Sequence, residues 1–186
     1  MPRVPPFDRS ATYEDLARLP EHLVAEIIDG SLHANPAPEP RVASSAMALG
    51  GTLRRAFEQR GPESWQLLPG PELHLGGDIL VPGLAGWRLA RLHELPATAY
   101  FSVPPDWVCE IRSSCAASLR ARKMEIYARE GVSHAWLFDP TARTLEVSRL
   151  EDGRWTVLAT HIGDQLVRAD PFEALELQLA AFWPRE

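Results

Sequence analysis

One acidic residue and one lysine stand in sequence settings that could support chemistry on phosphate esters. Glu110 lies inside the apolar segment WVCEI, and Lys123 follows thirteen residues later in a segment with helical spacing. An ionised carboxylate is costly to bury unless a cation, a metal ion or a hydrogen-bond donor receives it. Because a helix that follows a strand can fold back over the strand end, Lys123 is a candidate partner for Glu110. A buried structural ion pair explains the same two residues equally well.

The segment DILVPG contains a third position where a metal ligand could stand. Asp78 opens this segment, and Gly83 closes it after Pro82. On an extended strand the five-residue separation amounts to roughly 16 Å, and an odd offset turns the two side chains to opposite faces. A bulge at Gly76-Gly77 could change that parity and make Asp78 a ligand. Alternatively, Gly76-Gly77 is a turn and Asp78 is its polar flank.

The surrounding segments predict the elements that must position these residues. Asp29-Gly30 between two alternating apolar runs predicts a hairpin with Glu26 on its first strand, and Asp152-Gly153 predicts a second hairpin turn. Further strand patterns occupy residues 65–68, 72–75 and 78–82 and the segments DWVCEIR, HAWLFD, TLEVSRL and RWTVLA. Helical spacing predicts a short helix after Thr12, a helix over residues 43–60 and a third from about residue 116 to 129. The proline-rich stretch over residues 35–41 is expected to be an irregular loop.

Length and element order limit the fold class. With 186 residues, 45% of them hydrophobic, the chain suits one domain over residues 1–186, with residues 1–11 as an irregular N-terminal arm. Strands and helices do not alternate strictly along the chain. This mixed order favours an α/β (α+β) fold with a mixed or antiparallel sheet over a doubly wound parallel sheet.

Composition argues against several classes of protein. The chain has neither an apolar signal-peptide region nor a run of eighteen apolar residues, so we expect no membrane contact and a cytoplasmic location. Cys109 and Cys115 lack the spacing of a zinc site. The net charge of −6 argues against a protein coated with basic residues. Arg112, Arg120 and Arg122 still gather locally, either as a nucleic-acid-binding patch or as the solvated face of a helix.

Four segments in this order resemble a known family: EIIDGSL, DILVPGLAGWR, WVCEI and KMEIYAREGVSHAWLFDP. They are similar to the Uma-two family of restriction endonucleases, a branch of the PD-(D/E)XK nuclease superfamily. The likeness extends from about Thr12 to Trp183. It implies a restriction-endonuclease-like core in which helices flank a mixed central sheet. It also implies a Mg²⁺-dependent site that hydrolyses DNA phosphodiesters, and commonly a homodimer.

The resemblance assigns roles to individual residues. Glu110 matches the glutamate of the E-x-K motif, which holds the metal ion, and Lys123 matches the lysine that polarises the attacking water. Glu26 matches an N-terminal glutamate that supports the metal or its water. Position 112, where E-x-K would place lysine, is Arg112, which can stabilise a phosphate but stays protonated and cannot act as a base.

One departure from the family pattern bears on activity. Relatives carry Pro-Asp where this chain has Pro82-Gly83, so the second metal-binding carboxylate is missing unless Asp78 replaces it. Magnesium relies on one or two carboxylates in addition to water, and the loss of one should weaken its binding severely. The sequence therefore predicts an endonuclease-like protein with an impaired site. The alternative is a catalytically silent module that binds nucleic acid or protein and retains the nuclease fold.

Overall fold

The computed structural model describes residues 10–58, 64–112 and 117–184. Most of the predicted N-terminal arm over residues 1–11, and Cys115 of the excluded zinc site, therefore lie outside the described residues. The α-helices are α1 (Tyr13–Ala17), α2 (Pro40–Phe57) and α3 (Ala117–Arg129), and a 3₁₀ helix, η1 (Leu179–Phe182), lies near the C-terminus. In the part of the chain that the structure describes, no helix is both long and apolar enough to cross a membrane.

Two mixed sheets and one short antiparallel pair make up the β-structure. The five-stranded sheet has the order β2 (Ser31–Pro36), β1 (Leu23–Ile28), β5 (Asp78–Leu80), β4 (Glu72–Leu75) and β7 (Tyr100–Phe101). The six-stranded sheet has the order β11 (Arg154–Ile162), β10 (Thr144–Glu151), β9 (His134–Asp139), β8 (Trp107–Ile111), β6 (Leu84–Arg88) and β3 (Trp65–Pro69). The pair joins β12 (Leu166–Val167) to β13 (Leu177–Gln178).

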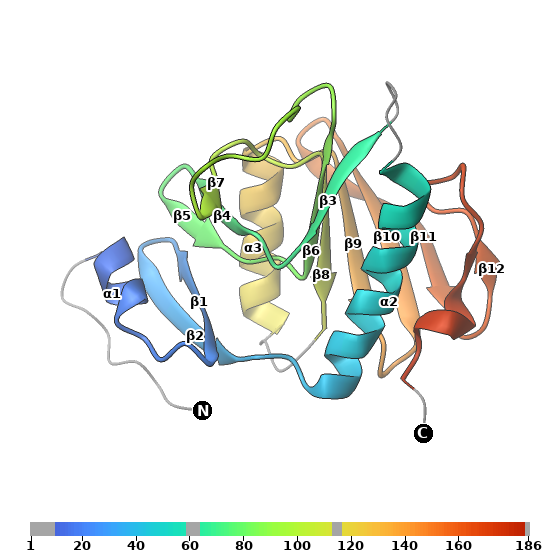
Figure 1. Ribbon diagram of the computed structural model, residues 1–186, viewed down its shortest axis with the longest axis horizontal. Coiled ribbons are helices and arrows are strands. Elements are labelled where there is room, and N and C mark those ends of the chain that lie inside the picture. The colour runs from blue at the N-terminus through green and yellow to red at the C-terminus, as the bar shows by residue number, and fades with distance from the viewer. Residues whose placement is uncertain (1–9, 59–63, 113–116, 185–186) are drawn as a thin grey trace.

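This architecture confirms the predicted α+β class with mixed sheets flanked by helices. The β8–β9 and β4–β7 pairs are parallel, whereas the remaining strand pairs are antiparallel. The six-stranded sheet takes the place of the expected central sheet, and the strands around Glu26 form a second sheet at its side (Figure 1). The candidate carboxylates of Glu26, in β1, and Glu110, in β8, therefore come from different sheets.

The predicted turns have the backbone geometry that their sequences favour. Asp29 and Gly30 adopt φ values of 50° and 72°, and the β1–β2 hairpin closes around them. Asp152 and Gly153, with φ values of 48° and 75°, close the β10–β11 hairpin. Positive φ at both turn positions matches the right-handed twist of the flanking strands. Both hairpin predictions are confirmed.

Two predicted boundaries are wrong. Residues 35–41 are only partly irregular, because β2 continues to Pro36 and α2 begins at Pro40. Proline is tolerated on an edge strand such as β2, and the first turn of a helix does not need its missing N–H. The strand predicted over residues 78–82 ends at Leu80, and the chain then passes from the five-stranded to the six-stranded sheet, where β6 begins at Leu84.

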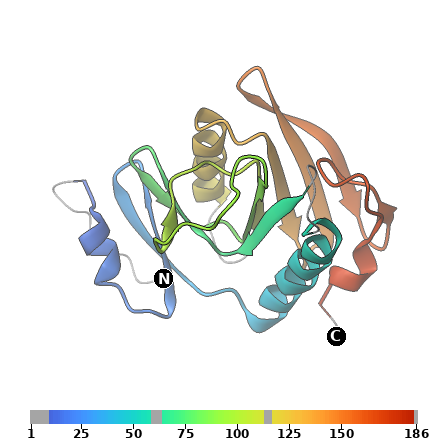
Figure 2. The same ribbon diagram turned by 45° about the horizontal axis from the view of Figure 1, so that its top comes forward.

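The six-stranded sheet is covered on both faces (Figures 1 and 2). On one face, α2 and the C-terminal segment bury a cluster that includes Leu49, Trp107 and Phe172. On the other face, α3 and the five-stranded sheet bury a cluster that includes Val108 and Tyr127. Successive strand residues point to opposite faces. The residues of β8 thus alternate between the two clusters, and Glu110 shares the α3 face with Val108.

Candidate active site

Four buried polar side chains meet where α3 crosses the two sheets. Glu110 comes from β8, Glu26 comes from β1, and α3 supplies both Lys123 and Tyr127. Lys123 and Tyr127 are four residues apart and therefore lie on the same face of the helix. That face also carries Ile126 and packs into the second core cluster, so apolar packing fixes the position of the polar groups.

The ammonium group of Lys123 lies between the two carboxylates. Its Nζ atom is 2.8 Å from Oε1 of Glu26 and 2.7 Å from Oε1 of Glu110, and it also donates to the carbonyl of Val81 at 3.2 Å. The Tyr127 hydroxyl donates to Oε1 of Glu110 at 2.7 Å, and the Val81 amide donates to Oε1 of Glu26 at 2.8 Å. We call Glu26, Lys123, Glu110 and Tyr127 the Lys123 cluster.

The charges of the cluster determine its proton affinities. Burial alone would lower the pKa of Lys123, but the negative charges of Glu110 and Glu26 outweigh burial and raise it above its usual value. Burial, followed by the charges of the same two carboxylates, holds the pKa of Tyr127 well above that of a free phenol. Lys123 therefore remains an ammonium ion and Tyr127 a neutral donor at neutral pH. Lys123 can stabilise negative charge, but it cannot serve as a general base.

A pocket opens beside Glu110 on the outer side of the cluster. Arg112 and Arg120 line it together with Asp139. The Arg112 guanidinium donates to Oδ2 of Asp139 at 2.8 Å, while the other oxygen of Asp139 accepts the amides of Thr141 and Ala142. Asp139 thus anchors Arg112 at the pocket rim and leaves its side chain 62% exposed.

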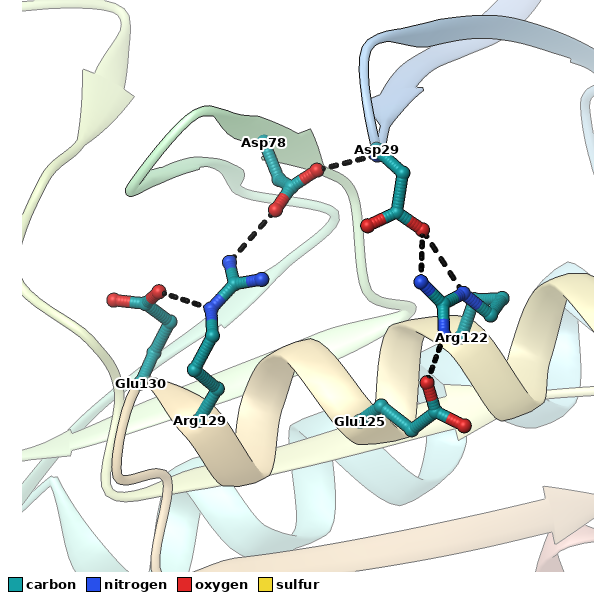
Figure 3. Close-up of polar contacts among 6 residues, drawn as sticks. All are labelled: Asp29, Asp78, Arg122, Glu125, Arg129 and Glu130. Atoms are coloured by element: carbon teal, nitrogen blue, oxygen red, sulfur yellow. Dashed lines mark hydrogen bonds and ion pairs between the residues drawn. The ribbon is translucent and has the colours of Figure 1, made fainter.

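Arg122 is separated from the other two predicted nucleic-acid-binding arginines. Its guanidinium lies against Asp29 at the β1–β2 turn, with Nε donating to Oδ2 at 2.9 Å, and it also pairs with Glu125 (Figure 3). Two carboxylates already neutralise this side chain. The structure thus brings Arg112 and Arg120 to the pocket and places Arg122 in a surface network that joins α3 to the hairpin.

Asp78 is buried and belongs to the same polar network as Asp29, not to the Lys123 cluster. Its Oδ1 atom accepts the backbone amide of Asp29 at 2.7 Å, and its Oδ2 atom accepts the guanidinium of Arg129 at 2.7 Å (Figure 3). Gly76 has a positive φ of 60° in the turn that precedes Asp78. These features match the interpretation of Asp78 as the polar flank of a turn. The structure does not bring it together with Glu110.

Gly83 stands at the position where the resemblance expects the aspartate. It lies one residue before β6, whose ladder with β8 ends at the pair Leu84–Cys109. A Cβ atom at Gly83 would lie 2.5 Å from Cγ1 and 2.6 Å from Cδ1 of Ile111. The side chain of Ile111 therefore occupies the space that a residue larger than glycine would need.

The donor set does not fit a resident magnesium ion. Among residues 10–58, 64–112 and 117–184, no group of three or more His, Cys, Asp or Glu side chains is placed to hold a metal. Glu26 and Glu110 offer hard oxygen ligands, but the ammonium group of Lys123 already bonds to one oxygen of each. A lysine cation thus supplies the positive charge that a metal ion would otherwise bring to these carboxylates.

Sequence reasoning identified Glu26, Glu110 and Lys123 but missed two contributors. Tyr127 was missed although its spacing of four residues from Lys123 was a usable signal. The backbone of Val81, which bonds to both Glu26 and Lys123, leaves no signal in the sequence. Burial raises the pKa of the Cys109 thiol well above its usual value, so this neighbour of Glu110 is an inert core residue.

Comparisons with known proteins agree with the fold. A crystal structure described as a "putative nuclease belonging to DUF820" from Anabaena variabilis matches with a TM-score of 0.75 and 20% sequence identity. The match covers 92% of this chain and 97% of that chain, and it supports the fold alone. No curated protein matches the sequence. The family model described as "Putative restriction endonuclease" matches residues 11–180, and the chain therefore belongs to the Uma-two family.

Proposed function

We propose that this protein is a DNA-directed endonuclease of its family whose magnesium-dependent hydrolysis of phosphodiesters is impaired. The observation that carries the proposal is Gly83, which offers no carboxylate where the resemblance expects one and faces the side chain of Ile111. The resemblance assigns Glu26, Glu110 and Lys123 to the family's catalytic set, and Lys123 contacts both carboxylates. If a magnesium ion were bound, Glu110 would hold it, Glu26 would assist and Lys123 would polarise the attacking water.

The residues of the wild-type site neutralise one another, so no metal-dependent step follows from them. Lys123 remains charged and satisfied by Glu26 and Glu110. To admit magnesium, the two carboxylates would have to exchange the lysine ammonium for a divalent ion that prefers more oxygen ligands than they supply. We therefore expect DNA cleavage by the wild-type protein to be slow or absent.

The pocket beside Glu110 supports DNA as the ligand. Arg112 and Arg120 both line it, together with the acidic residues Glu110, Asp139 and Glu146. Planar guanidinium groups match the geometry of phosphate oxygens. The net charge of −6 makes general attraction to DNA weak, so binding should depend on this local pair. The resemblance also implies a homodimer, which we propose as the assembly in solution.

The catalytic proposal is tested by nicking of supercoiled plasmid in the presence of Mg²⁺ or Mn²⁺. The variants are Glu110→Ala, Ile111→Ala and the double change Gly83→Asp with Ile111→Ala. The second change is needed because an aspartate at position 83 would collide with Ile111. We expect little nicking by the wild type and by Ile111→Ala, and clear nicking by the double variant. Strong nicking by the wild type that Glu110→Ala abolishes would contradict the impairment.

A second candidate function is a catalytically silent module that binds nucleic acid, and the close approach of Ile111 to position 83 favours it. Failure of the double variant to cut, despite intact folding, would favour this alternative.

DNA binding is measured without metal as fluorescence anisotropy of a labelled duplex. The variant Arg112→Ala/Arg120→Ala is compared with the exposed control Arg154→Ala. For each phosphate that an arginine no longer neutralises, the slope of log K against log salt should become shallower by about 0.9. Absence of wild-type binding at low salt would contradict DNA as the ligand.

A further inference from the structure

An apolar hollow lies between α2 and β3, apart from the Lys123 cluster. Its walls include Leu53, Leu67, Leu84 and Trp107, which belong to the core cluster that α2 covers. The Lys123 cluster lies under α3, and α2 and α3 stand on opposite faces of the six-stranded sheet (Figures 1 and 2). The hollow is therefore separate from the candidate active site, and the proposed nuclease function does not use it.

The size and the walls of the hollow suit one aromatic ring. Its volume is about 160 Å³, and an apolar cavity of about 150 Å³ is large enough to bind benzene. Trp107 supplies an aromatic surface, and pairs of aromatic rings are stabilised beyond the apolar area that they bury. Met47 also borders the hollow, and a thioether makes favourable contacts with aromatic rings. A single ring therefore matches both the volume and the lining.

Two glycines keep the α2 side of the hollow open. A Cβ atom on Gly50 would lie 2.9 Å from Cδ2 of Leu84, so packing within the chain requires glycine there. A Cβ atom on Gly51 would meet no atom of the described residues within 4 Å, although glycine in a helix interior is less favourable than alanine. Packing does not explain Gly51. An open rim does, because Gly51 lines both the hollow and a depression that adjoins it on the surface.

Positive charge gathers at this rim. Among the described residues that line the hollow, Arg54 is the one with a charged side chain. Arg54 also lines the adjoining depression, together with Arg55 and Glu58. One terminal nitrogen of Arg54 donates to Glu58 at 2.7 Å, but a guanidinium group has further N–H donors, and Arg55 adds a second positive charge. Two guanidinium groups against one carboxylate leave the rim positive, which favours an anionic group on the ligand.

We propose that this hollow binds a small aromatic carboxylate, with its ring between α2 and β3 and its carboxylate at Arg54. The two parts of the site call for both parts of the ligand. An apolar molecule without charge would leave the positive rim unmatched, and a simple anion would leave the hollow unfilled. The buried Nε1 atom of Trp107 has no hydrogen-bond partner among the described residues, so this residue of the wall also retains a donor. The proposal is independent of the nuclease function.

The first test is a titration of the full chain with phenylacetate, followed through the indole N–H signals in proton–nitrogen correlation NMR. The Trp107 signal is assigned with the variant Trp107→Phe. We expect it to shift until the site is saturated, at millimolar ligand or below. Phenylacetamide, which is neutral, should bind several times more weakly, and acetate, which lacks the ring, should leave the signal unchanged. A Trp107 signal that phenylacetate does not move would overturn the proposal, and equal affinity for the amide would overturn recognition of the carboxylate.

The second test changes the rim at two positions, each with a control on α2. Gly51→Leu should fold, because its Cβ atom has room, and should weaken phenylacetate binding at least tenfold; the exposed Ala48→Leu should not. Arg54→Gln should weaken binding of phenylacetate but not of phenylacetamide, whereas Arg41→Gln, about 20 Å away along the helix, should change neither. Equal binding by Gly51→Leu and Ala48→Leu would overturn the site. A Trp107 signal that shifts on dilution of the ligand-free protein would show that another protein molecule already fills the hollow, and would also overturn it.

Discussion

Removal of the lysine ammonium is the sharpest test of the buried cluster. In Lys123→Met, the carboxylates of Glu26 and Glu110, with side chains 4% and 10% exposed, lose the cation that lies 2.8 Å and 2.7 Å from them. Breaking a buried ion pair from one side costs about 3–5 kcal/mol. For a chain of this size each kcal/mol lowers Tm by about 2–4 °C, so we expect a fall on the order of 10 °C.

The pH dependence of the same variant has a definite sign. Two unpaired carboxylates close together raise each other's pKa, so the folded variant binds protons that the unfolded chain does not bind at the same pH. A folded-state pKa above the unfolded value makes the protein less stable as pH rises through that range. The stability deficit of Lys123→Met should therefore be larger at pH 8 than at pH 5. Urea unfolding at both pH values, followed by tryptophan fluorescence, measures it.

A neutral triple variant separates the effect of charge pairing from the effect of packing. Lys123→Met combined with Glu26→Gln and Glu110→Gln removes the uncompensated charges and should regain most of the stability, because the sites touch one another and their effects are not additive. If Lys123→Met lowers the free energy of unfolding by less than about 1 kcal/mol, the loss is within the range of exposed ion pairs. The cluster would then not carry the buried charge inferred for it. A triple variant as unstable as the single one would assign the deficit to packing.

Two smaller predictions concern Tyr127, a member of the Lys123 cluster, and Asp78, which lies outside it. Tyr127→Phe removes the hydroxyl that donates to Glu110 at 2.7 Å. The free energy of unfolding in urea should fall by about 1.5–3 kcal/mol, as expected for a hydrogen bond to a charged group. An unchanged midpoint would mean that this bond contributes nothing to stability. Asp78→Ala leaves the amide of Asp29 and the half-exposed guanidinium of Arg129 without their acceptor. The free energy of unfolding should fall by about 1–3 kcal/mol, while metal-free DNA binding stays at the wild-type level. A selective loss of DNA binding would contradict a purely structural role of Asp78.

Local sequence determined much of the fold and part of the site. Asp29-Gly30 predicted its hairpin because both residues tolerate positive φ, a property that does not depend on the rest of the chain. Glu110 and Lys123 were found because a charged residue in an apolar setting must have a partner, wherever the chain supplies it. The α+β class followed from the order of strand and helix patterns alone. These inferences all rest on energies set by a residue and its near neighbours.

Interactions between distant segments decided the rest. The chain changes sheets between Leu80 and Leu84, and this step directs Asp78 toward Arg129 and sets Gly83 against Ile111. Spacing along the chain allowed Asp78 to be interpreted as the flank of a turn, but it could predict neither the Arg129 partner of Asp78 nor the position of Ile111 against Gly83. The position of each side chain here depends on the register of strands paired across many residues and on the packing of α3 over both sheets. Long-range packing energy, which leaves no local signal in the sequence, therefore decided which carboxylates meet.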